Sequence, residues 1–132
     1  IAEHCRQLGI DWFASPWDVE SVEFLSQFEV PAHKVASACL TDDQLLRALR
    51  ATGRTVILST GMSTPEQIRH AVEVLGSRNT VLLHATSTYP APPEELNLRM
   101  IDTLMADYPN VPVGYSGHET GLQTTVAAVA RS

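Results

Sequence analysis

The sequence predicts an α/β protein in which parallel strands are joined by crossover helices. Short β-like runs recur five times along the 132 residues, helix-like segments separate them, and the connections are short. Regular alternation of this kind is typical of parallel sheets. A doubly wound sheet and a TIM barrel both satisfy it, and a five-stranded flavodoxin-like domain is the structural alternative.

The expected strands each combine β-branched or aromatic residues with a polar end. In chain order they cover residues 11–15, 33–37, 55–60, 80–86 and 111–116. The first expected helix covers residues 18–28, with its apolar side chains largely on one side. The next helices carry capping boxes, in which side chains bond the free amides of the first turn. These boxes are Thr41-x-x-Gln44, in a helix that stops near Gly53, and Thr64-Pro65-Glu66-Gln67. A fourth helix carries Leu96 to Met105, and a fifth follows His118.

Nucleotide-binding motifs give no reason to prefer the doubly wound sheet. No GxGxxG or GxxxxGK[ST] pattern follows any expected strand. A whole TIM barrel has eight strand–helix units and about 250 residues. Five units in 132 residues therefore amount to rather more than half of a barrel.

Composition excludes several classes of function. The net charge is −6 and the nine Lys and Arg residues are scattered, so no basic stripe is available for nucleic acid. No apolar run approaches the roughly 20 residues that span a bilayer. The two cysteines form no CxxC pair or disulfide framework, which favours a reducing, cytoplasmic location. The start lacks both Met and a signal pattern, so we expect the sequence to begin within a longer protein.

Hydroxyl side chains follow every expected strand at its carboxyl end. These are Ser15, Ser37, Ser59-Thr60, Thr86-Ser87 and Ser116. In a parallel barrel these ends converge on the face that carries the chemistry. Serine and threonine also cap helices, which is the structural alternative at any single position. Because all five strands share the feature, we predict a polar pocket in which these hydroxyls gather.

Two further side chains have both structural and functional interpretations. Lys34 lies inside an expected strand, and alternation alone does not decide whether it faces solvent or a barrel interior. In a barrel interior it would be a point charge for phosphate or carboxylate. His118 follows a glycine-rich strand end, Gly114-Tyr115-Ser116-Gly117, which lets a ligand approach the backbone. No second histidine is placed for metal binding nearby, so any metal there needs distant ligands.

Five motifs in order resemble the N-acetylneuraminate (sialic acid) synthase family. They are FASPWD at 13–18, VPAHKVAS at 30–37, LSTGMST at 58–64, LHATSTYPAP at 83–92 with ELNLR at 95–99, and VPVGYSGH at 111–118. Order and spacing agree over nearly the whole chain. The resemblance implies a TIM barrel, of which residues 1–132 would form strands three to seven, a partial catalytic domain. Strands one and two with a catalytic glutamate, strand eight with a second metal-binding histidine, and a C-terminal antifreeze-like domain would lie outside it.

The resemblance also implies roles for individual residues. Those expected to hold the phosphate and carboxylate of phosphoenolpyruvate are Lys34, Ser37, Ser59, Ser87 and Ser116. Tyr89 falls near the acceptor sugar. His118 matches a ligand of a divalent metal, Mn²⁺ or Mg²⁺, and with Lys34 it is expected to be catalytic.

The implied reaction is condensation of phosphoenolpyruvate with an N-acetylated amino-sugar aldehyde, above all N-acetylmannosamine. Pseudaminic and legionaminic acid synthases and enzymes for 6-phosphorylated acceptors share the motifs, so the sugar stays open. An inactive fragment, or a domain that binds sugar or phosphate without turnover, is the non-enzyme alternative. Three positions depart from the family pattern. Cys39 stands where many members have a glutamate, Ser87 where some have asparagine, and Gly117 where an aspartate commonly precedes the metal-binding histidine. We expect the full-length protein to be a homodimer.

Overall fold

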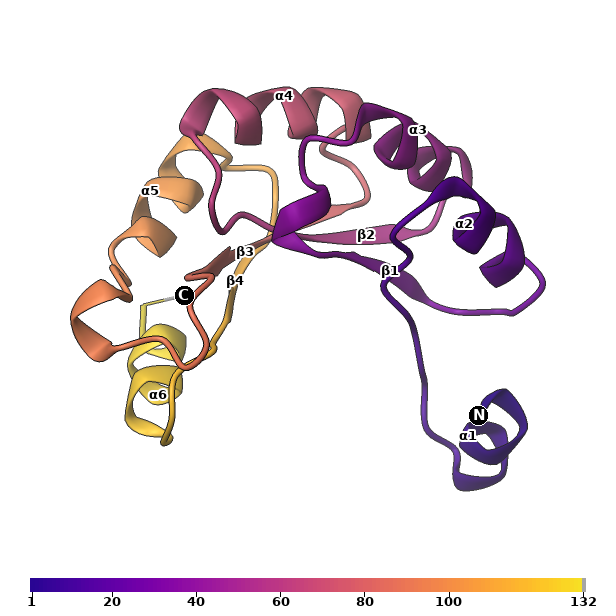
Figure 1. Ribbon diagram of the computed structural model, residues 1–132, viewed down its shortest axis with the longest axis horizontal. Helices are drawn as coiled ribbons and strands as arrows, with labels where there is room; N and C mark the ends of the chain where they lie inside the picture. Colours follow the sequence, from indigo (N-terminus) through magenta and orange to yellow (C-terminus); the bar gives the residue numbers. More distant parts are fainter. Residues whose placement is uncertain (132) are drawn as a thin grey trace.

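The computed structural model describes residues 1–131 and contains four parallel strands in one sheet, in the order β1-β2-β3-β4 (Figure 1). The strands are Ala32–Val35 (β1), Thr55–Ser59 (β2), Thr80–Ala85 (β3) and Val113–Ser116 (β4). The α-helices are Ala2–Leu8 (α1), Val19–Leu25 (α2), Asp43–Ala51 (α3), Pro65–Leu75 (α4), Met100–Asp107 (α5) and Gln123–Val129 (α6). Short 3₁₀ turns cover Ser37–Cys39 and Pro93–Glu95. None of the described helices is long and apolar enough to cross a membrane.

The sheet and its helices form an arc. Helices α2 to α5 follow the outer curve, and the strands line the inner side (Figure 1). The hydrophobic core lies between these layers and includes Val35, Leu45, Leu49, Leu58 and Leu82, all fully buried. A doubly wound domain would carry helices on both faces. The chain is therefore part of a (β/α)₈ barrel, as predicted, and the flavodoxin-like alternative is wrong.

The first expected strand, residues 11–15, does not form. Only Ala14 bridges to β1, where the Lys34 amide donates to the Ala14 carbonyl at 2.9 Å. A strand requires a repeated ladder of such bonds. This segment has a sheet neighbour on one side alone, and α1, which precedes it, stands apart from the rest of the arc (Figure 1). The expected helix at 18–28 is also shorter, because α2 ends at Leu25.

One of the two expected capping boxes is present. In α4 the Gln67 amide donates to the Thr64 hydroxyl at 3.3 Å, and the Thr64 amide donates to the Gln67 side chain at 2.9 Å. The box expected at Thr41 is wrong. Asp42 caps α3 instead, accepting from the Leu45 amide at 3.0 Å. Adjacent Thr and Asp residues are both good caps, so the sequence alone left this start ambiguous.

Candidate functional site

The inner face of the sheet presents Lys34, the only lysine of the chain. Val35 packs outward into the core, so alternation turns Lys34 inward. Its ammonium group donates to the Ser59 hydroxyl at 2.7 Å and to the Val35 carbonyl at 2.8 Å. Burial lowers the pKa of Lys34 from its ordinary value. A half-buried cation is thus held at the carboxyl ends of β1 and β2.

Ser37 and Ser87 converge on the backbone of Gly61, just beyond β2. The Gly61 amide donates to the Ser37 hydroxyl at 3.0 Å. A Cβ at position 61 would lie 2.3 Å from the Ser87 hydroxyl oxygen and 2.9 Å from that of Ser37, so a side chain here would displace both hydroxyls from their present positions. The Ser87 hydroxyl is buried and has no hydrogen-bond partner within residues 1–131. Buried polar atoms are rarely left unpaired, which makes this hydroxyl a candidate ligand contact.

His118 lies beyond β4 and is held from two sides. Its Nδ1 is 2.6 Å from the Thr86 carbonyl oxygen, which can only accept, so Nδ1 donates in this contact. Its ring lies against Tyr89, with the ring centroids 4.2 Å apart. Tyr89 itself is 74% exposed. The imidazole therefore has a defined orientation and keeps the lone pair of Nε2 for a ligand.

The remaining hydroxyls are less closely joined to this site. Ser116 is the last residue of β4 and lies opposite Ala85, the last residue of β3. It lies at the same carboxyl end of the sheet as the other site residues, and this position follows from the pairing of β4 with β3. Ser15 is exposed and follows the single bridge at Ala14. It is the one expected hydroxyl that neither lies in a strand of the sheet nor follows one within two residues.

A divalent metal fits His118 as one ligand. With Nδ1 bonded to a carbonyl, Nε2 is the nitrogen suited to coordination, which is the usual arrangement of metal-binding histidines. The part of the chain that the structure describes contains no group of three or more His, Cys, Asp or Glu side chains arranged for a metal. Within residues 1–131, His118 is therefore not part of a complete set of metal ligands.

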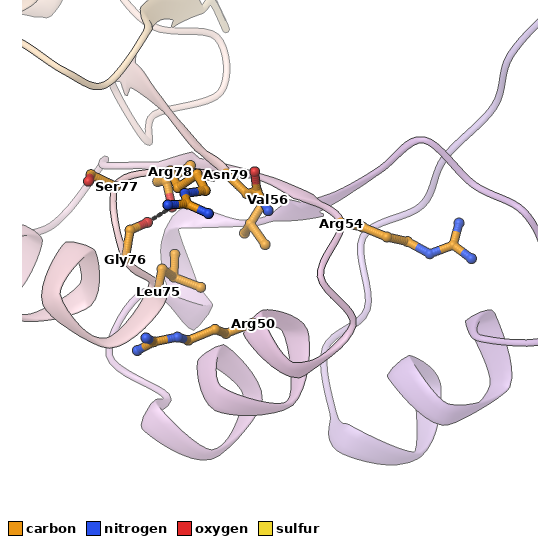
Figure 2. Close-up of a pocket in the computed structure, with 9 residues that line it drawn as sticks. Arg50, Arg54, Val56, Leu75, Gly76, Ser77, Arg78 and Asn79 are labelled. Carbon is orange, nitrogen blue, oxygen red and sulfur yellow. Dashed lines mark hydrogen bonds between the residues drawn. The ribbon is translucent and has the colours of Figure 1, made fainter.

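A hollow at the opposite end of the strands is a poor candidate. Arg50, Arg54 and Arg78 line it, near the amino ends of β2 and β3 (Figure 2). Figure 2 shows the guanidinium groups of Arg50 and Arg54 pointing apart. Arg50 donates to the Val74 carbonyl at 2.8 Å, and Arg54 donates to the Val30 carbonyl. Both arginines thus complete backbone hydrogen bonding, and no predicted site residue lines this hollow.

Sequence reasoning missed one polar pair beside the site. The Tyr115 hydroxyl donates to the Glu119 carboxylate at 2.7 Å. Burial and this carboxylate raise the pKa of Tyr115, so it remains a donor. Burial would raise the pKa of Glu119, but hydrogen bonds from Tyr115 and from nearby backbone amides lower it overall. The only sequence signal was an acid directly after His118.

Comparison with known proteins identifies relatives along the whole described chain. The model of the NeuB family matches residues 1–131. An N-acetylneuraminate-9-phosphate synthase of Drosophila melanogaster is 36% identical over 132 residues, which is 98% of this chain and 36% of that protein. An N,N'-diacetyllegionaminic acid synthase of Campylobacter jejuni is also 36% identical, over 96% of this chain and 39% of its own length.

Solved structures agree in fold. The N-acetylneuraminic acid (sialic acid) synthetase of Leptospira borgpetersenii, solved with citrate, superposes with a TM-score of 0.92 at 35% identity. The match covers 97% of this chain and 45% of that one. A 3-deoxy-D-arabino-heptulosonate 7-phosphate synthase of Thermotoga maritima has a TM-score of 0.76 at 14% identity, which is a likeness of fold alone. The chain thus spans less than half the length of the two synthases above and of the Leptospira synthetase.

Proposed function

The chain belongs to the NeuB family, and we propose that it forms the donor side of an active site that joins phosphoenolpyruvate to an N-acetylated amino-sugar aldehyde. The products are a sialic acid-type nonulosonate and phosphate, and the acceptor we expect is N-acetylmannosamine. One observation carries the proposal. The only lysine of the chain meets a serine hydroxyl at the carboxyl ends of β1 and β2, next to the Ser37–Gly61–Ser87 junction.

This arrangement suits a small dianion. Lys34 supplies a positive charge whose half-buried setting strengthens its attraction for phosphate or carboxylate. Ser37, Ser59 and Ser87 supply hydroxyls that can donate to the same oxygens. The unpaired Ser87 hydroxyl has a hydrogen bond to offer without breaking one inside the protein. Together these groups would hold the donor in place, so they would act by positioning and electrostatics.

The reaction forms one carbon–carbon bond and releases one phosphate. The methylene carbon of phosphoenolpyruvate attacks the aldehyde carbon, whose oxygen becomes a hydroxyl. Water adds to the resulting cation at the neighbouring carbon, and phosphate leaves to give the keto acid. When Mn²⁺ or Mg²⁺ is bound, it supplies Lewis-acid polarisation of the aldehyde. His118 would offer Nε2 to it, and Tyr89, stacked on His118, would lie beside the acceptor.

More than one acceptor sugar is compatible with the relatives of this chain. The insect N-acetylneuraminate-9-phosphate synthase and the Campylobacter diacetyllegionaminic acid synthase are equally similar to this chain, at 36% identity. A legionaminic or pseudaminic acid precursor, or a 6-phosphorylated sugar, is therefore the alternative acceptor. The donor and the bond formed are the same in each case.

The test uses the full-length protein that carries this chain. We expect phosphate release from phosphoenolpyruvate with one N-acetylated sugar of a panel, and a product mass equal to donor plus acceptor plus water minus phosphate. Lys34→Met keeps the length of the side chain but removes the charge. It should weaken donor binding by roughly 1.5–3 kcal/mol, or about one to two decades. His118→Ala should strongly reduce turnover and metal binding.

Matched controls are available on the outer helices. Arg47→Met removes an exposed cation and His70→Ala an exposed imidazole, both paired with Asp43 far from the site. Neither should change donor or metal affinity. Lower melting temperatures with unchanged ligand affinity in Lys34→Met and His118→Ala would show that both positions are structural, and the proposal would then fail.

A further inference from the structure

Glu119 lies directly after His118, and its carboxylate turns back toward β4. Tyr115 lies in β4, one residue before its end, and its hydroxyl donates to the Glu119 carboxylate at 2.7 Å. Both side chains are partly buried. The pair therefore spans the segment that carries His118, with one partner on the strand and the other beyond it.

Gly117 lies beneath this pair. A Cβ at position 117 would fall 2.6 Å and 2.8 Å from the two Glu119 carboxylate oxygens, and 2.8 Å from a ring carbon of Tyr115. These separations are shorter than real Cβ contacts, so a side chain at 117 would displace the Glu119 carboxylate and the Tyr115 ring from their present positions. The Glu119 carboxylate can therefore take this position because residue 117 has no side chain.

Gly117 and Glu119 are the chain neighbours of His118. Its ring is held by the Thr86 carbonyl and by Tyr89. A shift of the backbone at 117 or 119 would rotate the imidazole away from those partners. We propose that Glu119 is a positioning residue, which clamps Tyr115 across Gly117 and thereby sets the direction in which His118 presents Nε2. The inference rests on the proposed function in that His118 is taken as a metal ligand.

The first experiment measures Mn²⁺ affinity of the full-length protein by electron paramagnetic resonance. Glu119→Ala removes the clamp and should weaken Mn²⁺ binding roughly 10-fold or more, as the loss of groups that orient metal ligands does. Tyr115→Phe removes the donor and should act in the same direction. Glu119→Gln keeps an acceptor oxygen at the same reach, so its Mn²⁺ affinity should stay close to that of the unchanged protein.

The second experiment is a double-mutant cycle between positions 117 and 119. Gly117→Ala should weaken Mn²⁺ binding when Glu119 is present, because the new Cβ displaces the carboxylate. In a Glu119→Ala background the carboxylate is gone and only the Tyr115 ring still meets the new Cβ, so the same change should cost clearly less than it does with Glu119 present. Equal losses in both backgrounds would overturn the proposal.

Thermal unfolding of the metal-free variants separates positioning from a structural role. Lower melting temperatures with unchanged Mn²⁺ affinity would overturn the proposal, even if the variants remain folded. An unchanged protein that binds no Mn²⁺ would overturn it too. Mn²⁺ binding with the expected coupling but without synthase activity would defeat only the proposed function, because the cycle does not depend on turnover.

Discussion

The adjacent side chains of His33 and Lys34 in β1 face opposite sides of the sheet, and they differ in hydrogen bonding. Lys34 faces inward and finds two hydrogen-bond acceptors. His33 faces the helices, is 1% exposed, and neither of its ring nitrogens has a partner among the described residues. Burial lowers the pKa of His33, and the positive charge of Arg54 lowers it further. The imidazole is thus held neutral where a charge would be costly.

The pKa of His33 gives stability a pH dependence. In the unfolded chain the imidazole titrates near its ordinary value of 6.5. Below that pH the unfolded state binds more protons than the folded state, so the free energy of unfolding should fall as pH drops below 6.5. Urea unfolding of the full-length protein at pH 7.5 and pH 5.5 measures this loss. His33→Leu should make this loss of unfolding free energy smaller. His70→Leu, at an exposed position, should leave the part of the loss that comes from His33 unchanged. Equal losses in wild type and His33→Leu would contradict the prediction.

At the scale of elements, α4 begins with the most complete cap of the described helices. Thr64 and Gln67 bond each other's backbone, and Pro65 occupies the first helical position. Thr64→Ala leaves amides of the first turn without their partner, and it should lower the free energy of unfolding by about 0.5–2 kcal/mol. Denaturant titration measures this. Thr103→Ala, at an exposed position within α5, is the control and should be close to neutral. A loss at Thr103 equal to that at Thr64 would show that the cap is not the cause.

At the scale of the whole molecule, the arc leaves apolar surface uncovered. Large exposed hydrophobic side chains include Leu8, Ile10, Phe13, Trp17, Phe24, Leu122, Val126 and Val129. The sheet also ends in open edges at β1 and β4, apart from the bridge at Ala14. Open edges and apolar patches are templates for association.

We therefore predict that residues 1–132, produced alone, aggregate or fold only in part and show no synthase activity. Analytical ultracentrifugation and a thermal melt, alongside the full-length protein, measure this. The full-length protein is the positive control, because further strands of a barrel would cover the inner face and edges. A soluble, cooperatively melting, active monomer of 132 residues would contradict the prediction.

The candidate site could be predicted in outline but not in its contacts. The motifs placed Ser37, Ser59 and Ser87 near strand ends, and their grouping follows from parallel strands, whose carboxyl ends meet at one edge. The bond between Lys34 and Ser59 joins residues 25 apart in sequence. Such a contact depends on the pairing of β1 with β2, which is a feature of the tertiary structure. The pair of Tyr115 and Glu119 was missed because the two side chains meet over Gly117, and this contact is visible only in the tertiary structure.

The sequence by itself determined the parallel α/β fold, the strands that became β2 and β3, and the start of α4, because periodicity and capping are local properties. Tertiary structure alone decided that Lys34 faces inward, since the helices cover the face of β1 that carries Val35. It also decided that residues 11–15 do not form a strand. A side chain's face and a strand's existence both depend on what packs against them, and those partners lie elsewhere in the chain or beyond it.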